Sequence, residues 1–294
     1  MHSREDVKPK AAQPKNRPPG AFARRFADCP QKAVVYSYDG SFSGFLCCAF
    51  ASWRRREIPC AVCREPAYAL PLFAVRQVRR DAEKADWTAN FIRENLGGEV
   101  LRFLRRAFLT CLDGKELCML RFLQLACEKG PPVLEMLADE RVLILYKAVL
   151  RRDKEAERYR GFLRFSQYRG VLLAVIEPEN FILRLLGRHF RERLPNERFL
   201  IYDRAHRSAF VYSGAQERLF EAGDFIPPEF DEAEKAYRRL WRIFYDNVTI
   251  KSRENRRAYA SRLPQRYRPQ MTEFQEDRPA KEEAPDRTAR RQEI

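Results

Sequence analysis

The sequence predicts an α+β fold, and three features of the chain carry that prediction. A β-branched and aromatic run opens the body of the chain, a long stretch with helical periodicity follows, and several short β segments come after it. The first run, residues 34–38, ends at the turn pair Asp39-Gly40, and Ser41 can then cap a helix that continues to about residue 53. The body is therefore expected to begin as strand, turn and helix.

Residues 81–152 have the 3.6-residue periodicity of amphipathic helices. Gly97-Gly98 and Gly130-Pro131-Pro132 divide the stretch, because glycine and proline both disfavour the interior of a helix. We expect a central helical layer here. The preceding segment, 54–70, is interpreted as irregular, and a second strand is expected at 72–78.

After the helical stretch the pattern changes to short β segments. Arg169-Gly170 is a turn pair between two of them, and a helix is expected to start near Pro178. The predicted strands are residues 162–165, 171–177, 199–203 and 209–213. Together these elements form a β-β-α-β-β unit, which suits an antiparallel sheet with helices packed on one side.

The last predicted element is a basic C-terminal helix. Apolar residues recur there at the spacings that place them on one helical face. This stripe comprises Ala233, Ala236, Tyr237, Leu240, Trp241 and Phe244. Arg238, Arg239 and Arg242 lie off the stripe, so the sequence predicts a strongly amphipathic helix.

Composition divides the chain into a flexible basic arm (1–33), one α+β globular domain (34–274) and a disordered tail (275–294). The formal net charge is +15. The arm holds eight basic and three acidic residues and the tail five and six, which leaves +11 on the body. A positive folded body favours polyanionic partners such as nucleic acid or an acidic protein surface.

Two sequence features bear on location. The first six residues are polar, and the most apolar short segment, 45–53, is far below the roughly 20 residues that cross a bilayer. We expect a cytoplasmic protein without a membrane span. The eight cysteines are then expected to be reduced thiols.

The segment 237–268 is the leading candidate for a nucleic-acid surface. It holds ten basic residues against two acids and interleaves them with aromatic side chains, which can stack on bases while arginine pairs with phosphates. A similar mixture surrounds 160–164, where the predicted strand places Arg160, Phe162 and Arg164 on one face. The candidate contacts are Arg164, Trp241, Arg253, Asn255, Arg266 and Tyr267. The alternative is that Trp241 and Phe244 are core residues and the arginines form solvated faces or salt bridges.

Several segments together resemble an uncharacterised bacterial family labelled a probable DNA metabolism protein. They are Tyr38–Phe42 with Gly44–Cys47, Gly161–Phe165, Glu197–Arg204, Phe244–Ile250, Arg253–Asn255 and Pro264–Tyr267. The resemblance implies association with a radical SAM protein of DNA modification or repair, and some relatives are fused to a uracil-DNA glycosylase domain. We expect any such chemistry to come from another polypeptide.

Signals for catalysis and for metals are weak. Cys60 and Cys63 have the spacing of half a zinc site, but no second pair matches them, so no metal and no cofactor is expected. Asp39 and Glu177 are carboxylates that a nucleic-acid lyase or nuclease could use, although turn formation and helix N-terminal charge explain them more simply. His206 has no recognisable partner in the sequence.

The sequence therefore favours a DNA-binding, partner-dependent accessory protein in DNA repair or modification. Two alternatives stay open. One is a nucleic-acid-processing enzyme that uses carboxylates such as Asp39 and Glu177, and the other is a protein-only adaptor for an acidic partner.

Overall fold

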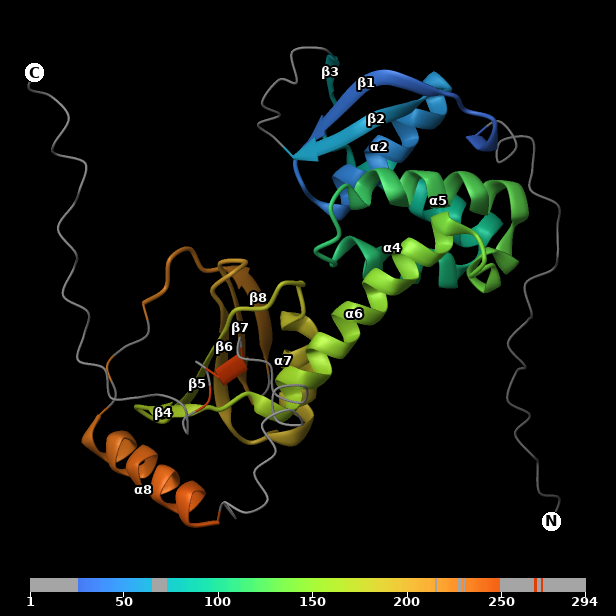
Figure 1. The fold of residues 1–294 in the computed structure, drawn as a ribbon. Coiled ribbons are helices and arrows are strands. Elements are labelled where there is room, and N and C mark those ends of the chain that lie inside the picture. The colour runs from blue at the N-terminus through green and yellow to red at the C-terminus, as the bar shows by residue number, and fades with distance from the viewer. Residues whose placement is uncertain are drawn as a thin grey trace, which may run out of the picture. The chain divides into compact units, whose positions relative to one another are not determined.

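A computed structural model describes residues 26–64, 73–214, 216–226, 229, 231–248, 267–268 and 271. The chain divides into two compact units, Met1–Asp153 and Lys154–Ile294, and each is described by itself. Both units contain helices and strands (Figure 1), so the predicted α+β class is confirmed. The prediction of one globular domain over 34–274 stays a prediction.

Unit 1 begins with a three-stranded parallel sheet. Its strands are β1 (Gln31–Tyr38), β2 (Ile58–Arg64) and β3 (Ala74–Gln77), in the order β2-β1-β3. Helix α2 (Phe42–Arg55) connects β1 to β2, and Ser41 caps it by accepting a hydrogen bond from the Gly44 backbone N–H at 2.9 Å. The predicted strand, turn and helix are thus confirmed. Strand β2 falls in the segment that was expected to be irregular.

The remainder of unit 1 is helical, as predicted. The helices are α3 (Ala82–Phe91), a π-helical turn (Ile92–Leu96), α4 (Gly98–Phe108), α5 (Lys115–Lys129), a 3-10 turn (Pro131–Glu135) and the start of α6 (Glu140–Phe162). Gly97 separates the π-helical turn from α4 with a φ of 99°, which an L side chain rarely adopts. Helix α5 packs against β2 and α2 packs against β1, so apolar side chains of the sheet and helices form one core.

Unit 2 is built on a five-stranded mixed sheet. The elements are β4 (Ser166–Tyr168), β5 (Val171–Ile176), α7 (Leu183–Arg193), β6 (Arg198–Asp203), β7 (Ser208–Ser213) and β8 (Glu217–Glu221). The strands are ordered β4-β5-β6-β7-β8. Helix α7 covers one face of β6 and β7, with Gly187 so close to Phe210 that an added Cβ would lie 2.5 Å from the ring.

Two details of this sheet correct the prediction. The β5–β6 pair is parallel, because α7 carries the chain back across the sheet, whereas the other three pairs are antiparallel. The predicted strand 162–165 does not form. Helix α6 extends to Phe162, and Leu163 still donates its N–H to the Tyr159 carbonyl at 2.9 Å. Tyr159 and Leu163 are buried in the core of unit 2, so tertiary packing keeps this segment helical.

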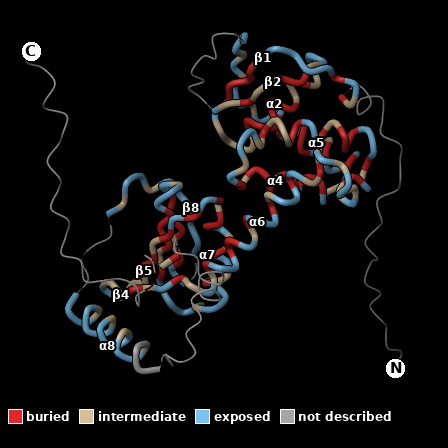
Figure 2. The backbone as a smooth tube through the Cα atoms, in the orientation of Figure 1, coloured by how far each residue is buried: buried red, intermediate tan, exposed pale blue. Residues whose placement is uncertain are grey.

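Helix α8 (Glu232–Val248) is the predicted C-terminal helix. Figure 2 shows it mostly exposed or half-buried, in contrast with the buried central strands of the sheet. Among the described residues, no helix combines the length and the apolar character needed to cross a membrane.

Candidate nucleic-acid interface at strand β4 and helix α8

Strand β4 is the edge strand of the sheet in unit 2 and has an arginine at each end. Arg164 precedes it, and Arg169 follows it in the turn to β5. Arg169 and Gly170 both have positive φ, 46° and 78°, as a two-residue type I′ hairpin turn requires. The predicted turn pair is therefore confirmed, and it leaves the Arg169 guanidinium over the Tyr168 ring, 5.4 Å from its centroid.

Helix α8 is attached to β4 through polar side chains. The Gln167 backbone N–H donates to Glu234 Oε2 at 3.1 Å, which satisfies a donor that an edge strand leaves unpaired. Arg238 donates to Ser166 Oγ and also forms an ion pair with Glu234 at 3.0 Å. Because Glu234 and Arg238 are one helical turn apart, they hold one polar face of α8 against the strand.

Two predicted contact residues meet at this junction. The Arg164 guanidinium lies 5.0 Å from the centroid of the Trp241 ring, a cation–π geometry. Arg164 is exposed, and Trp241 is 37% exposed. Phe244 lies next to Trp241, with ring centroids 5.8 Å apart. We call Arg164, Tyr168, Arg169, Trp241 and Phe244 the β4–α8 surface.

The apolar stripe of α8 is exposed rather than buried. The exposed fraction is 72% for Tyr237, 62% for Leu240 and 57% for Phe244. Glu234, Arg238 and Arg242 are half-buried on the other side of the helix. The alternative that Trp241 and Phe244 are core residues is therefore wrong for the described part of the chain. Exposed apolar groups of this size on one helix are typical of an interaction surface.

Tyr267, another predicted contact, does not join this surface. Tyr267 is 1% exposed and packs edge-on against Tyr159, with ring centroids 4.9 Å apart, so its ring is not available to stack on a base. Its place in the core of unit 2 corrects that prediction. Arg253, Asn255 and Arg266 lie outside the described residues.

The predicted sheet face around Arg160 is also corrected. Arg160 and Phe162 belong to helix α6, so the alternation of a strand does not apply to them. Arg160 forms an ion pair with Glu157 one helical turn earlier. Arg164, which follows the helix, lies on the β4–α8 surface.

The two carboxylates of the enzyme alternative belong to different units. Asp39 accepts hydrogen bonds from the Ser41 backbone N–H at 2.9 Å and from Ser41 Oγ at 2.7 Å, so it forms the turn before α2. Glu177 forms an ion pair with Arg204 at 2.5 Å. Each carboxylate has a local structural role, and neither unit contains both.

His206 has a partner that sequence analysis missed. The fully buried Asp203 accepts hydrogen bonds from His206 Nδ1 at 2.8 Å and from the His206 backbone N–H at 3.1 Å. Burial raises the pKa of Asp203 above its ordinary value, and the hydrogen bond and charge of His206 partly offset that rise. Asp203 ends β6 beside the end of β5, at the carboxyl edge of the parallel pair. The sequence feature that could have indicated this pair is the Asp-x-x-His spacing in the turn between two predicted strands.

The second histidine of unit 2 is less suited to chemistry. His189 lies half-buried on α7, with its ring edge-on to Phe190 at 5.0 Å. Burial and then the charges of Arg160 and Arg193 lower the pKa of His189, so the neutral imidazole is favoured.

The geometry of strand β2 argues against a joint metal site at Cys60 and Cys63. Residues three apart on a strand point to opposite faces of the sheet. Cys60 Sγ donates to the Val34 carbonyl at 3.3 Å. Within the described ranges, no cluster of three or more histidine, cysteine, aspartate or glutamate residues is placed to hold a metal ion.

Comparison with known proteins adds one match. The model of a family described as a domain of unknown function, DUF4130, matches residues 113–273, which is more than half of the 294 residues. No curated protein and no solved structure matches the chain.

Proposed function

We propose that this chain, which belongs to the DUF4130 family of unknown function, is a DNA-binding, partner-dependent accessory protein in cytoplasmic DNA repair or modification. The observation that carries the proposal is the Arg164–Trp241 pair, in which a guanidinium lies 5.0 Å from a partly exposed indole ring. Arg169 and Tyr168 repeat the combination at the other end of β4.

These pairs suit non-specific binding to nucleic acid. Every base presents a π-face, so an aromatic platform accepts any sequence, and a neighbouring arginine can contact a phosphate or stack on the base itself. The formal charge of +15 adds a long-range attraction to the polyanion. Arg253, Asn255 and Arg266 stay in the proposal as predictions from the sequence.

Two observations support the proposal that the protein acts together with a partner. The family resemblance suggests a radical SAM protein of DNA modification or repair, and a uracil-DNA glycosylase, as partners that would supply the chemistry. The exposed apolar side chains Tyr237, Leu240 and Phe244 on α8 suit contact with another macromolecule. A protein-only adaptor would use the same helix without DNA.

Separate Arg164→Ala and Trp241→Ala variants test the DNA-binding proposal. Binding of a random duplex and of an unstructured single strand is measured by fluorescence anisotropy between about 50 and 200 mM salt. Arg164→Ala should reduce the salt slope by about 0.9 on the duplex or about 0.7 on the single strand for one lost phosphate contact. Trp241→Ala should weaken single-strand binding by about 1 to 3 kcal/mol.

Arg191→Ala is the matched control, because Arg191 is a half-buried arginine of unit 2 that forms an ion pair with Glu217 on another part of the sheet. It removes the same charge but should leave affinity and salt slope close to those of the unmodified protein. Equal DNA affinity and equal salt slope for all three variants would contradict the proposal. So would the absence of binding to either DNA at low salt.

Asp203 and His206 favour an enzyme as the second candidate function. In the tautomer in which Nδ1 donates to an ionised Asp203, the lone pair of the ring is on Nε2, which is the arrangement of a general base held by an aspartate. His206→Gln should abolish any cleavage of nucleic acid by the purified protein, and Asp203→Asn should shift the pH profile of that cleavage. Intact substrates after incubation with the unmodified protein would exclude this candidate.

A further inference from the structure

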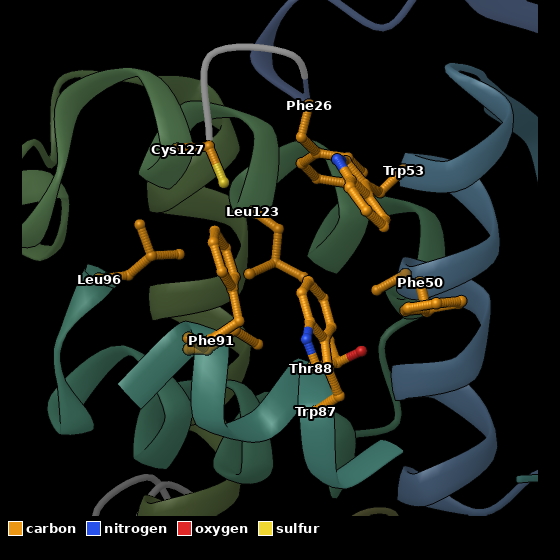
Figure 3. A pocket seen from close by; sticks show the side chains of 11 residues that line it. Phe26, Phe50, Trp53, Trp87, Thr88, Phe91, Leu96, Leu123 and Cys127 are labelled. Atoms are coloured by element: carbon orange, nitrogen blue, oxygen red, sulfur yellow. The ribbon is translucent and has the colours of Figure 1, made fainter. Parts of the chain in front are cut away.

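Unit 1 contains an aromatic pocket between helices α2, α3 and α5 (Figure 3). Phe50 and Trp53 extend from α2, and Trp87 and Phe91 extend from α3. Its accessible volume is only about 30 Å³, well below the range of about 300 to 1,000 Å³ for ligand pockets. The pocket is therefore too small to enclose a planar ring, and such a ring would lie on the exposed aromatic side chains at its mouth.

The rings in this pocket are arranged as a stack. Trp53 and Trp87 lie 5.4 Å apart with 22° between their planes, and Trp87 and Phe91 lie 5.6 Å apart with 10° between theirs. Phe50 meets Trp87 edge-on at 5.4 Å. Trp87 is 41% exposed, which is unusual for so large a ring in a folded core. Near-parallel rings offer flat surfaces to another flat ring.

The wall behind the rings has an irregular backbone. Ile92 and Leu96 line the pocket and belong to the π-helical turn that follows α3. Short π-helical turns inside helices occur frequently at functional sites. Thr88 Oγ1 already donates to the Lys84 carbonyl at 2.8 Å, so this threonine hydroxyl has no further proton to donate to a ligand.

Positive charge lies beside the pocket on one side. The Arg54 guanidinium lies 5.8 Å from the centroid of the Trp53 ring, and Arg55 and Arg56 follow it at the end of α2. All three arginines are exposed. The α3 side carries the exposed acid Asp86, so the cationic track runs along α2. Aromatic platforms next to such a track are typical of single-strand binding sites.

We propose that one unstacked base of single-stranded nucleic acid stacks on the exposed Trp87 at the mouth of this pocket, with Arg54 and Arg55 on the adjoining phosphates. The inference rests on the proposed function and adds a second contact point to it. The side chains lining the pocket are almost entirely apolar, so the hydrogen-bonding edge of the base faces the solvent and any base is accepted. An apolar side chain of a protein partner would not make use of the positive charge of the adjoining arginines, whereas the phosphates of a nucleic acid would pair with it.

The tryptophans allow this pocket and the β4–α8 surface to be observed separately. The chain has three of them, and Trp53 and Trp87 are in the pocket while Trp241 is on α8. In a full-length Trp241→Phe variant, all tryptophan emission comes from the pocket. Titration with a sixteen-nucleotide poly-dT strand, roughly the largest site size of a single-strand-binding module, should quench that emission saturably.

Affinity measurements complete the test. Trp87→Ala should weaken poly-dT binding by roughly 5- to 150-fold, the range for loss of one stacked base. Trp87→Phe keeps a ring and should recover most of the affinity. Arg54→Ala with Arg55→Ala should lower the salt slope by about 1.4 in total on a single strand. The control Arg102→Ala, at an exposed arginine of α4 that is paired with Glu99, should not lower it.

The outcomes separate the two proposals. Quenching of Trp241 alone, with Trp87→Ala binding normally, would overturn the pocket and leave the β4–α8 surface in place. Quenching in the Trp241→Phe variant, together with unchanged DNA affinity and salt slope of Arg164→Ala and Trp241→Ala, would support the pocket and refute the β4–α8 surface. Saturable quenching by an apolar peptide but not by poly-dT would also overturn the pocket proposal, since its occupant would then be a protein side chain.

Discussion

Replacing Tyr267 with alanine should destabilise unit 2 without weakening DNA binding. Tyr267 is 1% exposed, and its ring lies 4.9 Å from that of Tyr159 and 6.1 Å from that of Phe162. Removing a buried aromatic side chain from a core costs about 3 to 5 kcal/mol. Of this, each aromatic pair accounts for about 0.5 to 1.5 kcal/mol. Tyr267→Phe keeps both ring contacts and should retain most of the stability.

Urea denaturation measures this loss, and Trp241 makes it specific to unit 2. In a Trp53→Phe and Trp87→Phe background, emission from Trp241 reports only the unit that contains Tyr267. The free energy of unfolding should fall for Tyr267→Ala, with anisotropy at low urea showing unchanged DNA affinity per folded molecule. A loss below about 1 kcal/mol together with at least tenfold weaker DNA binding would refute the reasoning, because it would place the ring at the DNA.

Three further predictions concern the core, the buried acid and the thiols. Gly187→Ala should destabilise unit 2 by about 1 to 3 kcal/mol, since the new Cβ would lie 2.5 Å from the Phe210 ring, and Phe210→Leu in the same chain should recover part of the loss in urea denaturation. The folded-state pKa of Asp203 is raised above 3.8, so its stabilising contribution is present below that pH and is lost as the pH rises through the folded-state value. As the pH rises above 3.8 the unmodified protein should therefore lose more unfolding free energy than Asp203→Asn does, and parallel pH profiles would argue against a buried ionising carboxyl. Elemental analysis should find no stoichiometric zinc or iron, and one tightly held ion that disappears in a Cys60→Ser and Cys63→Ser variant would contradict the opposite-face geometry.

Local physical chemistry made several elements predictable from the sequence alone. The turn at Asp39-Gly40, the cap at Ser41 and the turn at Arg169-Gly170 depend on backbone preferences of the residues themselves. The helical layer and helix α8 depend on periodicity within one segment. The sequence also indicated Arg164 and Trp241 as candidate contacts, and the tertiary structure brings them within 5.0 Å of each other.

The tertiary structure decided the features that depend on residues far apart in the chain. Strand β2 forms because β1 provides a parallel partner, with Pro59 near its start, where the missing N–H matters least. The β5–β6 pair is parallel because α7 returns the chain across the sheet. Neither the formation of β2 nor the parallel pairing of β5 with β6 follows from the local sequence pattern of the strands.

The burial and the neighbours of the candidate site residues also depend on residues far apart in the chain, so the sequence pattern did not predict them. Tyr267 looked like an exposed aromatic in a basic segment, but it is buried because Tyr159, more than a hundred residues earlier, packs against it. The aromatic pocket joins rings from α2 and α3, and its floor comes from α5. On its own, the sequence determined which segments form helices, turns and most of the strands, since those depend on neighbouring residues. Which side chains are buried and which meet at a site was decided by the tertiary structure, because burial depends on contacts between distant segments.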